Sequence, residues 1–168
     1  MVYPAGVRSE PQFNIAARTD KETMSVIRIL VADDHALVRE SIRAILASQS
    51  DMEIVATAGD GNEAVQLAMF HQPDVVVMDI SMPSMDGIHA TELILRARKE
   101  TSIVILSMHV NAALVQQAMR MGARAYVLKR RATDELPKAI RAAARGETFL
   151  SPAIPASERR CRGSSPLQ

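Results

Sequence analysis

The sequence predicts an α/β protein with a five-stranded parallel sheet that carries helices on both faces. Apolar runs of four to six residues recur along the chain, and segments with helical spacing of apolar residues separate them. Continuous apolar runs are typical of parallel strands that are buried on both faces. Because crossovers between parallel strands are right-handed, we expect a doubly wound sheet in which every strand ends at the same edge.

The five strands are expected where aliphatic and β-branched residues are continuous. Their expected ranges are 26–32, 52–57, 74–78, 103–106 and 125–128. The third range holds Val75, Val76, Val77 and Met78 in a row, directly before Asp79. We therefore expect a fully buried strand with a carboxylate at its exit.

The helices between the strands have their own start and stop signals. The third is expected from about residue 88 to 99. Asn111 is expected to cap the fourth, which stops at Gly122. Thr133 is expected to cap the fifth, where Pro137 is tolerated because it lies in the first turn. The apolar faces of the first, second and fifth helices comprise Val38, Ile42, Ile45 and Leu46, then Ala64, Leu67 and Ala68, then Leu136, Ile140 and Ala144.

Composition excludes several classes of protein. The chain has 168 residues and a net charge of +1, so its total charge gives no reason to expect nucleic-acid or membrane binding. Its one cysteine, Cys161, excludes an intramolecular disulfide framework and fits a reducing compartment. The apolar runs are too short to span a membrane, and no secretory signal is visible at the N-terminus.

The two ends of the chain lack sustained periodicity. Residues 1–24 carry turn and charge signals and are expected to form a flexible arm, with Met24 as an alternative start. Residues 151–168 are expected to form a disordered tail because they are rich in proline, serine and arginine. The folded domain is therefore expected over residues 25–150.

Polar side chains follow four of the five strands at the edge where the strands end. Asp33 and Asp34 follow the first, Asp79 the third, Ser107 the fourth and Lys129 the fifth. Ligands of open parallel sheets bind at this edge. Clustered carboxylates need a cation among them, and oxygen ligands suit Mg²⁺. A lysine and a hydroxyl opposite the acids can hold an oxyanion, so the set favours phosphoryl chemistry.

Each of these residues has an ordinary structural interpretation when it is taken alone. Asp33 and Asp34 could form a helix N-cap, and Asp79 could be a turn residue at a strand end. His35, His71 and His89 are expected to face solvent or cap helices. The joint occurrence of the acids, the hydroxyl and the lysine at one edge favours the functional interpretation.

In this order the residues resemble the receiver domain of two-component response regulators. The matching motifs are Asp33-Asp34, Asp79 with Met82-Pro83 and Asp86-Gly87, Ser107, Tyr126 and Lys129, over roughly residues 26–150. The stretches 31–35, 106–109 and 146–152 resemble the subfamily that precedes a LuxR/NarL-type helix-turn-helix. The resemblance implies a flavodoxin/CheY-like (βα)5 fold with strand order 2-1-3-4-5.

The resemblance also implies a phosphoacceptor and a metal site. Asp79 would accept the phosphoryl group. Asp34 would bind Mg²⁺ directly, with Asp33 helping through water. Asp79 and the backbone carbonyl of Ser81 would complete the protein ligands.

The same resemblance gives roles to five residues in holding the phosphoryl group, in switching and in hydrolysis. Lys129 and Ser107 would hold the phosphoryl oxygens. Tyr126 would change rotamer as Ser107 moves inward, and so report phosphorylation at the surface. Ser81 and His109 would tune hydrolysis.

The implied partners are those of a cytoplasmic signalling protein in transcriptional regulation. A cognate sensor histidine kinase, or a small acyl phosphate, would donate the phosphoryl group. The chain would act as a phosphoacceptor that promotes its own phosphotransfer and autodephosphorylation rather than as an enzyme. The fourth helix, fifth strand and fifth helix would form the partner surface, used for a homodimer among other contacts, and no membrane is involved.

The chain departs from the LuxR/NarL-type pattern after Pro152. Relatives continue into a DNA-binding domain, whereas here 153–168 remain. We therefore expect no specific DNA binding by these residues, from either a truncated regulator or a single-domain receiver. Two other classes are disfavoured. An aspartyl-phosphate phosphohydrolase would carry a second aspartate at Ser81, and a pseudo-receiver would not need the intact acid set.

Overall fold

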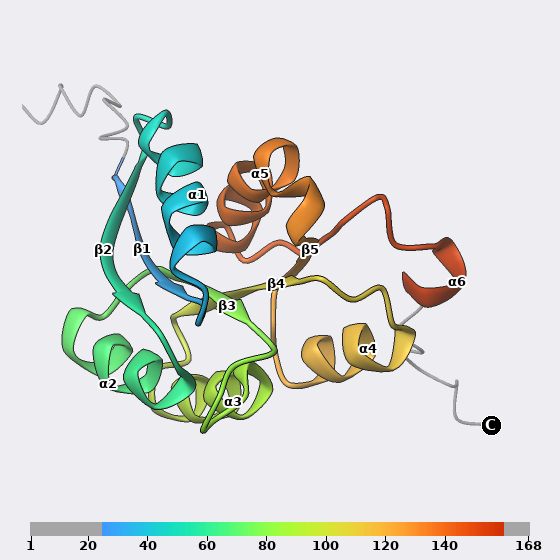
Figure 1. The fold of residues 1–168 in the computed structure, drawn as a ribbon, viewed down its shortest axis with the longest axis horizontal. Helices are drawn as coiled ribbons and strands as arrows, with labels where there is room; N and C mark the ends of the chain where they lie inside the picture. Colours follow the sequence, from blue (N-terminus) through green and yellow to red (C-terminus); the bar gives the residue numbers. More distant parts are fainter. Residues whose placement is uncertain (1–24, 160–168) are drawn as a thin grey trace, which may run out of the picture.

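A parallel sheet of six strands forms the middle layer of the structure, a computed structural model that describes residues 25–159 (Figure 1). The strand order is β2-β1-β3-β4-β5-β6. The predicted order of the first five strands is confirmed, and the predicted count of five is wrong. The strands are Ile27–Ala32 (β1), Met52–Ala58 (β2), Val75–Asp79 (β3), Ser102–Ser107 (β4), Ala125–Leu128 (β5) and Phe149–Leu150 (β6).

The sixth strand is short and lies at the edge of the sheet. Phe149 and Leu150 pair in parallel with Ala125 and Tyr126 of β5. Two residues are too few for any hydrophobic periodicity, so the sequence pattern gave no strand signal here.

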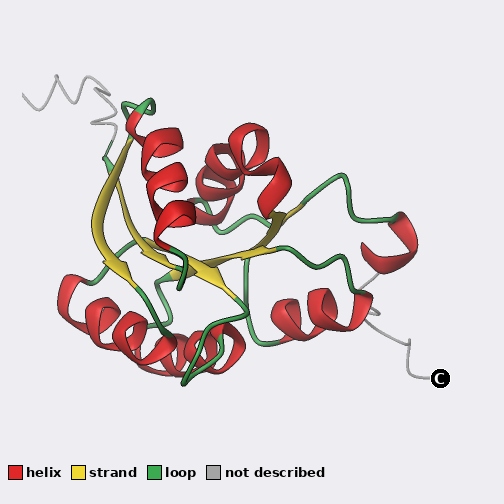
Figure 2. Cartoon of the chain, viewed as in Figure 1, coloured by secondary structure: helices red, strands yellow, loops and turns green. Residues whose placement is uncertain are grey.

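Helices cover both faces of the sheet, as expected. α1 and α5 lie on one face, and α2, α3 and α4 lie on the other (Figures 1 and 2). The helices are Ala36–Ala47 (α1), Gly61–His71 (α2), Gly87–Ala97 (α3), Ala112–Arg120 (α4), Ala132–Ala144 (α5) and Ala156–Arg159 (α6).

The helix starts agree with the sequence at α4 and differ at α5. The side chain of Asn111 accepts hydrogen bonds from the backbone N–H groups of Ala113 and Leu114, so the predicted cap is confirmed. A 3-10 turn, Lys129–Arg131 (η1), leads directly into α5. Arg131 therefore occupies the N-cap position, and Thr133 lies inside the first turn rather than capping it.

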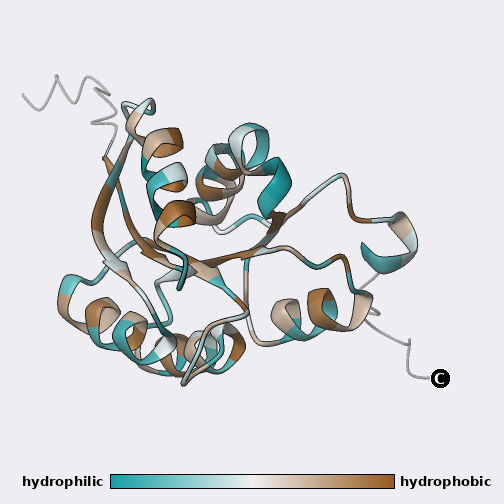
Figure 3. Cartoon of the chain, in the orientation of Figure 1, coloured by the Kyte–Doolittle hydropathy of each residue, from teal (hydrophilic) through white to brown (hydrophobic). Residues whose placement is uncertain are grey.

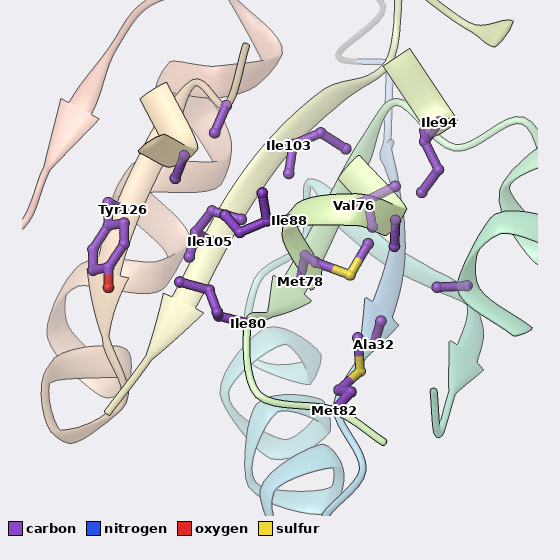
Figure 4. Close-up of a cluster of buried hydrophobic side chains, with 14 of the residues drawn as sticks. Ala32, Val76, Met78, Ile80, Met82, Ile88, Ile94, Ile103, Ile105 and Tyr126 are labelled. Carbon is purple, nitrogen blue, oxygen red and sulfur yellow. The ribbon is translucent and has the colours of Figure 1, made fainter. Parts of the chain in front are cut away.

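Two apolar clusters hold the layers together, one on each face of the sheet. One joins the strands to α1 and α5 through residues such as Ile42 and Leu136. The other joins them to α2, α3 and α4, with Ile88 and Ile94 of α3 meeting the strand side chains (Figure 4). The strands are accordingly hydrophobic over most of their length (Figure 3). With both faces buried, the functional groups are left at the strand ends.

The stretch after residue 150 differs from the expected disordered tail in the part that is described. Ser151 and Ile154 are buried, and residues 156–159 form α6. Ile154 provides the reason, because its side chain joins the apolar cluster on the α4 face. The rest of the predicted tail and the predicted arm, residues 1–24, lie outside the described residues.

None of the helices in the described part of the chain combines the length and the apolar character that a membrane crossing requires.

Candidate functional site

Two carboxylates and one ammonium group meet where β1, β3 and β5 end. Asp33 follows β1, Asp79 is the last residue of β3, and Lys129 follows β5. Lys129 Nζ lies 2.7 Å from Asp33 Oδ2 and 3.2 Å from Asp79 Oδ2. Both carboxylates are almost fully buried. The parallel topology thus brings together groups that are 46 and 50 positions apart in the chain (79 − 33 and 129 − 79).

Burial shifts the pKa of the Asp79 carboxyl group. Desolvation raises the pKa of its carboxyl group, Lys129 opposes this increase, and Asp33 adds to it. The backbone N–H of Ser81 donates a hydrogen bond to Asp79 Oδ1 at 3.2 Å. One oxygen of Asp79 is thus bonded to the backbone, and the other faces Lys129.

Lys129 is held in its charged form by the two acids. Desolvation alone would lower the pKa of its ammonium group, but the hydrogen bonds and charges of Asp33 and Asp79 raise it overall. Its side chain is 10% exposed. The site therefore contains a fixed positive charge at neutral pH, next to the carboxylate that we expect to be modified.

Asp34 and His35 extend the acidic cluster toward solvent. Ligand atoms of Asp33, Asp34, His35 and Asp79 all lie within 4.8 Å of one another. The Asp34 carboxylate is 27% exposed, and its Oδ1 lies 2.9 Å from His35 Nδ1. His35 occupies the N-cap position of α1 but makes no side-chain capping bond. The N-cap interpretation of Asp33 and Asp34 is therefore wrong, and the sequence missed His35 as a member of the cluster.

The cluster contains more negative than positive charge. Oδ2 of Asp33 and Oδ2 of Asp79 are buried and share the single ammonium group of Lys129, and Oδ1 of Asp34 is next to His35. The ion pairs with Lys129 compensate only part of this negative charge. An all-oxygen donor set with room for water suits Mg²⁺.

A second group of polar residues lies at the end of β4 and on β5. Ser107 is buried, and its Oγ accepts a hydrogen bond from the backbone N–H of His109 at 3.1 Å. The hydroxyl of Tyr126 donates to the backbone carbonyl of His109 at 3.0 Å. The Tyr126 ring is fully buried, and burial raises the pKa of its hydroxyl (Figure 4). Ser107, His109 and Tyr126 are thus linked to one another by hydrogen bonds.

The loop after Asp79 is fixed by its apolar residues and by two close backbone contacts. Ile80 and Met82 are buried on either side of the exposed Ser81 (Figure 4). A Cβ at Gly87 would collide with the carbonyl oxygen of Asp79, and a Cβ at Gly61 would collide with Met85. The sequence indicated Gly87 only as a turn residue, because a close approach between backbones leaves no mark on the local pattern.

The predicted site residues are therefore brought to one edge of the sheet, in two hydrogen-bonded or ion-paired groups. One group contains Asp33, Asp34, Asp79 and Lys129, and Ser81 joins it through its backbone N–H. The other contains Ser107, His109 and Tyr126. The two groups are neighbours in the sheet, because Ser107 pairs with Leu128, the residue before Lys129.

The sequence is similar to known proteins of one family. The family model described as the response regulator receiver domain matches residues 29–141. The oxygen regulatory protein NreC of Staphylococcus carnosus is 42% identical over 132 residues, which cover 78% of this chain and 61% of that protein. The transcriptional regulatory protein DegU of Brevibacillus brevis is 35% identical over 128 residues, which cover 76% of this chain and 54% of that protein. The chain thus spans little more than half the length of these relatives.

Two solved structures share this fold over almost their whole length. A two-component response regulator of the LuxR family from an Aurantimonas species has a TM-score of 0.75 and 38% identity, covering 80% of this chain and 95% of that chain. The signal receiver domain of a NarL response regulator from Mycobacterium tuberculosis has a TM-score of 0.69 and 34% identity, covering 73% of this chain and 99% of that chain. With more than half of its length matched by the family model, the chain belongs to the response regulator receiver domain family.

Proposed function

We propose that the chain is a phosphoacceptor switch and that Asp79 is the residue that becomes phosphorylated. The observation that carries this proposal is the buried Asp79 carboxylate beside Lys129, 3.2 Å from its Nζ, in a cluster of acids at the strand ends. A carboxylate oxygen of Asp79 would form a bond to phosphorus. The bond between phosphorus and the donor would break, and the donor would leave with the electron pair.

Lys129 and Ser107 would stabilise the transferred group. The Lys129 ammonium would neutralise charge on the phosphoryl oxygens, which preorganised charges do efficiently in a water-poor site. The hydroxyl of Ser107 would donate a hydrogen bond to the same oxygens. Its Oγ already accepts from His109, and a hydroxyl can accept and donate at the same time.

The excess of carboxylates over ammonium groups supports a Mg²⁺ site at the same place. Asp33, Asp34 and Asp79 would hold the ion, with the backbone carbonyl of Ser81 as a further ligand. A bound Mg²⁺ would compensate negative charge at the phosphorus and on the carboxylates. Ser81 and His109 would tune hydrolysis from their positions two residues after Asp79 and Ser107.

The partners that fit this function are those of a signalling module. We infer that a cognate histidine kinase donates the phosphoryl group, that the receiver unit spans residues 25–150, and that the surface of α4, β5 and α5 serves contacts such as a homodimer. Tyr126, a residue of β5 that is linked to Ser107 through His109, would report the modification. The LuxR-family and NarL likeness supports a role in transcriptional regulation in the cytoplasm.

Intact mass measurement tests the proposed phosphorylation. The chain is incubated with acetyl phosphate and Mg²⁺, and the mass should rise by one phosphoryl group. Asp79→Asn should abolish the gain, and excess chelator should suppress it. Asp86→Asn is the matched control, because Asp86 lies in the same loop but only caps α3. An equal gain in Asp79→Asn would assign the phosphorylation to another residue.

A further inference from the structure

The described C-terminal segment, residues 149–159, packs against the part of the fold that contains Tyr126. We call this segment the C-terminal strap. Its β6 pairs with β5, and its Ile154 is fully buried in the cluster that contains Tyr126. Its α6 packs against α4 at the far edge of the sheet (Figure 1). The strap therefore covers part of the surface on which we expect phosphorylation to be reported.

Arg159 links the end of the strap to its middle. Its guanidinium donates to the backbone carbonyl of Ile154 at 2.5 Å and to that of Pro152 at 2.9 Å. The backbone N–H of Ile154 donates to the carbonyl of Ser151 at 2.9 Å. The strap thus forms a small closed unit, so movement at Ser151 affects the whole segment.

A continuous series of hydrogen bonds joins the phosphoryl-binding hydroxyl to this unit. The backbone N–H of His109 donates to Ser107 Oγ at 3.1 Å, and the Tyr126 hydroxyl donates to the His109 carbonyl at 3.0 Å. The backbone N–H of Ser151 then donates to the Tyr126 carbonyl at 2.9 Å. Ser107 and the strap are therefore connected through one residue of the loop after β4 and one residue of β5.

The hydroxyl proton of Ser107 is available to a phosphoryl oxygen. In the structure Ser107 Oγ acts as an acceptor, and a serine hydroxyl also carries one proton to donate. A phosphoryl group on Asp79 would accept that proton and fix the Ser107 rotamer. In this rotamer Ser107 Oγ accepts from the backbone N–H of His109, whose carbonyl accepts from the Tyr126 hydroxyl. Phosphorylation therefore favours the buried Tyr126 side chain, which shares an apolar cluster with Ile154 of the strap.

We propose that phosphorylation of Asp79 strengthens the docking of the C-terminal strap on β5 and α4. The inference rests on the proposed phosphorylation and names the element of this chain that responds to it. A ligand shifts an equilibrium by its differential affinity for the two states. Phosphorylation that favours the docked strap is therefore itself favoured when the strap is docked.

Hydrogen exchange of the full chain, read by mass spectrometry, tests the proposal. The chain is compared with and without acetyl phosphate in the presence of Mg²⁺, and its intact mass is recorded from the same samples. Amides of the strap, including those of Ser151 and Ile154, should exchange at least about fivefold more slowly after phosphorylation, the lower end of typical allosteric couplings. Tyr126→Phe removes only the hydroxyl, so the mass gain should remain while the slowing is lost.

Ser102→Ala is the matched control for the loss of a hydroxyl. Ser102 lies at the other end of β4, and its Oγ donates to the Ala143 carbonyl at 2.8 Å, away from the strap. This variant should keep the slowing. Arg159→Gln should speed exchange throughout the strap in both states without touching the core. Unchanged exchange in Arg159→Gln would show that the strap is not held as described, and would overturn the proposal.

The outcomes separate this inference from the function on which it rests. Absence of a mass gain in the native chain overturns the proposed phosphorylation and the inference together. A mass gain without slower strap exchange overturns the inference alone. Slowing that persists in Tyr126→Phe overturns it as well, because the hydroxyl would then not carry the coupling.

Discussion

At the scale of single residues, the negative charge of Asp79 opposes folding even though Lys129 is beside it. Burial raises the pKa of the Asp79 carboxyl group above its ordinary value of 3.8. The unfolded chain therefore releases this proton at lower pH than the folded chain, and stability falls as the pH rises from 3.8 through the folded pKa. Below that window the residue imposes no penalty.

Asp79→Asn should accordingly be more stable than the native chain when Mg²⁺ is removed. The advantage should be absent in acid, appear as the pH rises through the window above 3.8, and then level off. Urea unfolding in excess chelator measures it. Adding Mg²⁺ should stabilise the native chain, because ligands that bind the folded state raise its stability, and should stabilise the variant less. Asp134→Asn, at an exposed carboxylate of α5, should show neither effect.

Gly87 permits the backbone of α3 to approach Asp79. Gly87→Ala should destabilise the protein by about 2–3 kcal/mol, in the range of overpacked cores, because its Cβ collides with the Asp79 carbonyl. The same collision should displace the carboxylate and reduce phosphorylation by acetyl phosphate. Gly59→Ala is the control, since a Cβ there meets no atom closer than 3.7 Å, and its effect should stay within about 0.5 kcal/mol. Equal unfolding free energies for both variants would contradict the predicted collision.

At the scale of secondary structure elements, one ion pair connects α5 to the start of β2. Arg141 donates two hydrogen bonds of 2.8 Å to Asp51 and one of 2.6 Å to Gln49. The hydrogen bond from Arg141 lowers the pKa of the Asp51 carboxyl group below its ordinary value of 3.8. The pair therefore stabilises the fold above 3.8, and this contribution is lost as the pH falls through the folded pKa.

Arg141→Gln should lose about 1 kcal/mol of stability at neutral pH, the upper end for pairs that remain partly exposed. The loss should vanish in acid as Asp51 becomes protonated. A double-mutant cycle with Asp51→Asn isolates the coupling. Arg145→Gln removes an exposed pair with Glu147 from the same end of α5 and should have no measurable effect. A coupling that survives at low pH would show that Arg141 acts through packing instead of charge.

The elements that the sequence predicted well are those with long, periodic apolar patterns. The first five strands and their order followed from continuous apolar runs and from the family resemblance. The strand β6 could not be predicted, because Phe149 and Leu150 gain strand character only by pairing with β5. The start of α5 was misplaced because a 3-10 turn precedes it, so that the helix begins before Thr133.

The candidate site was predictable to the extent that parallel strands share an exit edge. Asp33, Asp79 and Lys129 each follow or end a strand, and topology alone brings them together. The contact of His35 with Asp34 was not predictable, because it depends on how the first turn of α1 is oriented. The bond from Tyr126 to His109 likewise depends on the path of the loop after β4.

At the scale of the whole molecule, helices α1 to α5 lie against the two faces of the sheet. Specific DNA recognition needs an element that enters a groove and reads base edges. α6, which lies beside α4, has four residues. We expect these 168 residues to show no preference for a promoter sequence over competitor DNA in gel-shift assays at physiological salt, with or without phosphorylation. Sequence-selective retardation would contradict this expectation.

The buried Tyr126 also gives the protein an intrinsic optical probe. The chain has no tryptophan and two tyrosines, so its emission under light that phenylalanine does not absorb comes from Tyr3 and Tyr126 alone. Tyr3→Phe would leave one emitting phenol, whose hydroxyl is bonded to His109 inside the fold. Phenol emission responds to hydrogen bonding and to nearby charge. Events at the strand ends can therefore be followed in real time by fluorescence, without an added dye or a label.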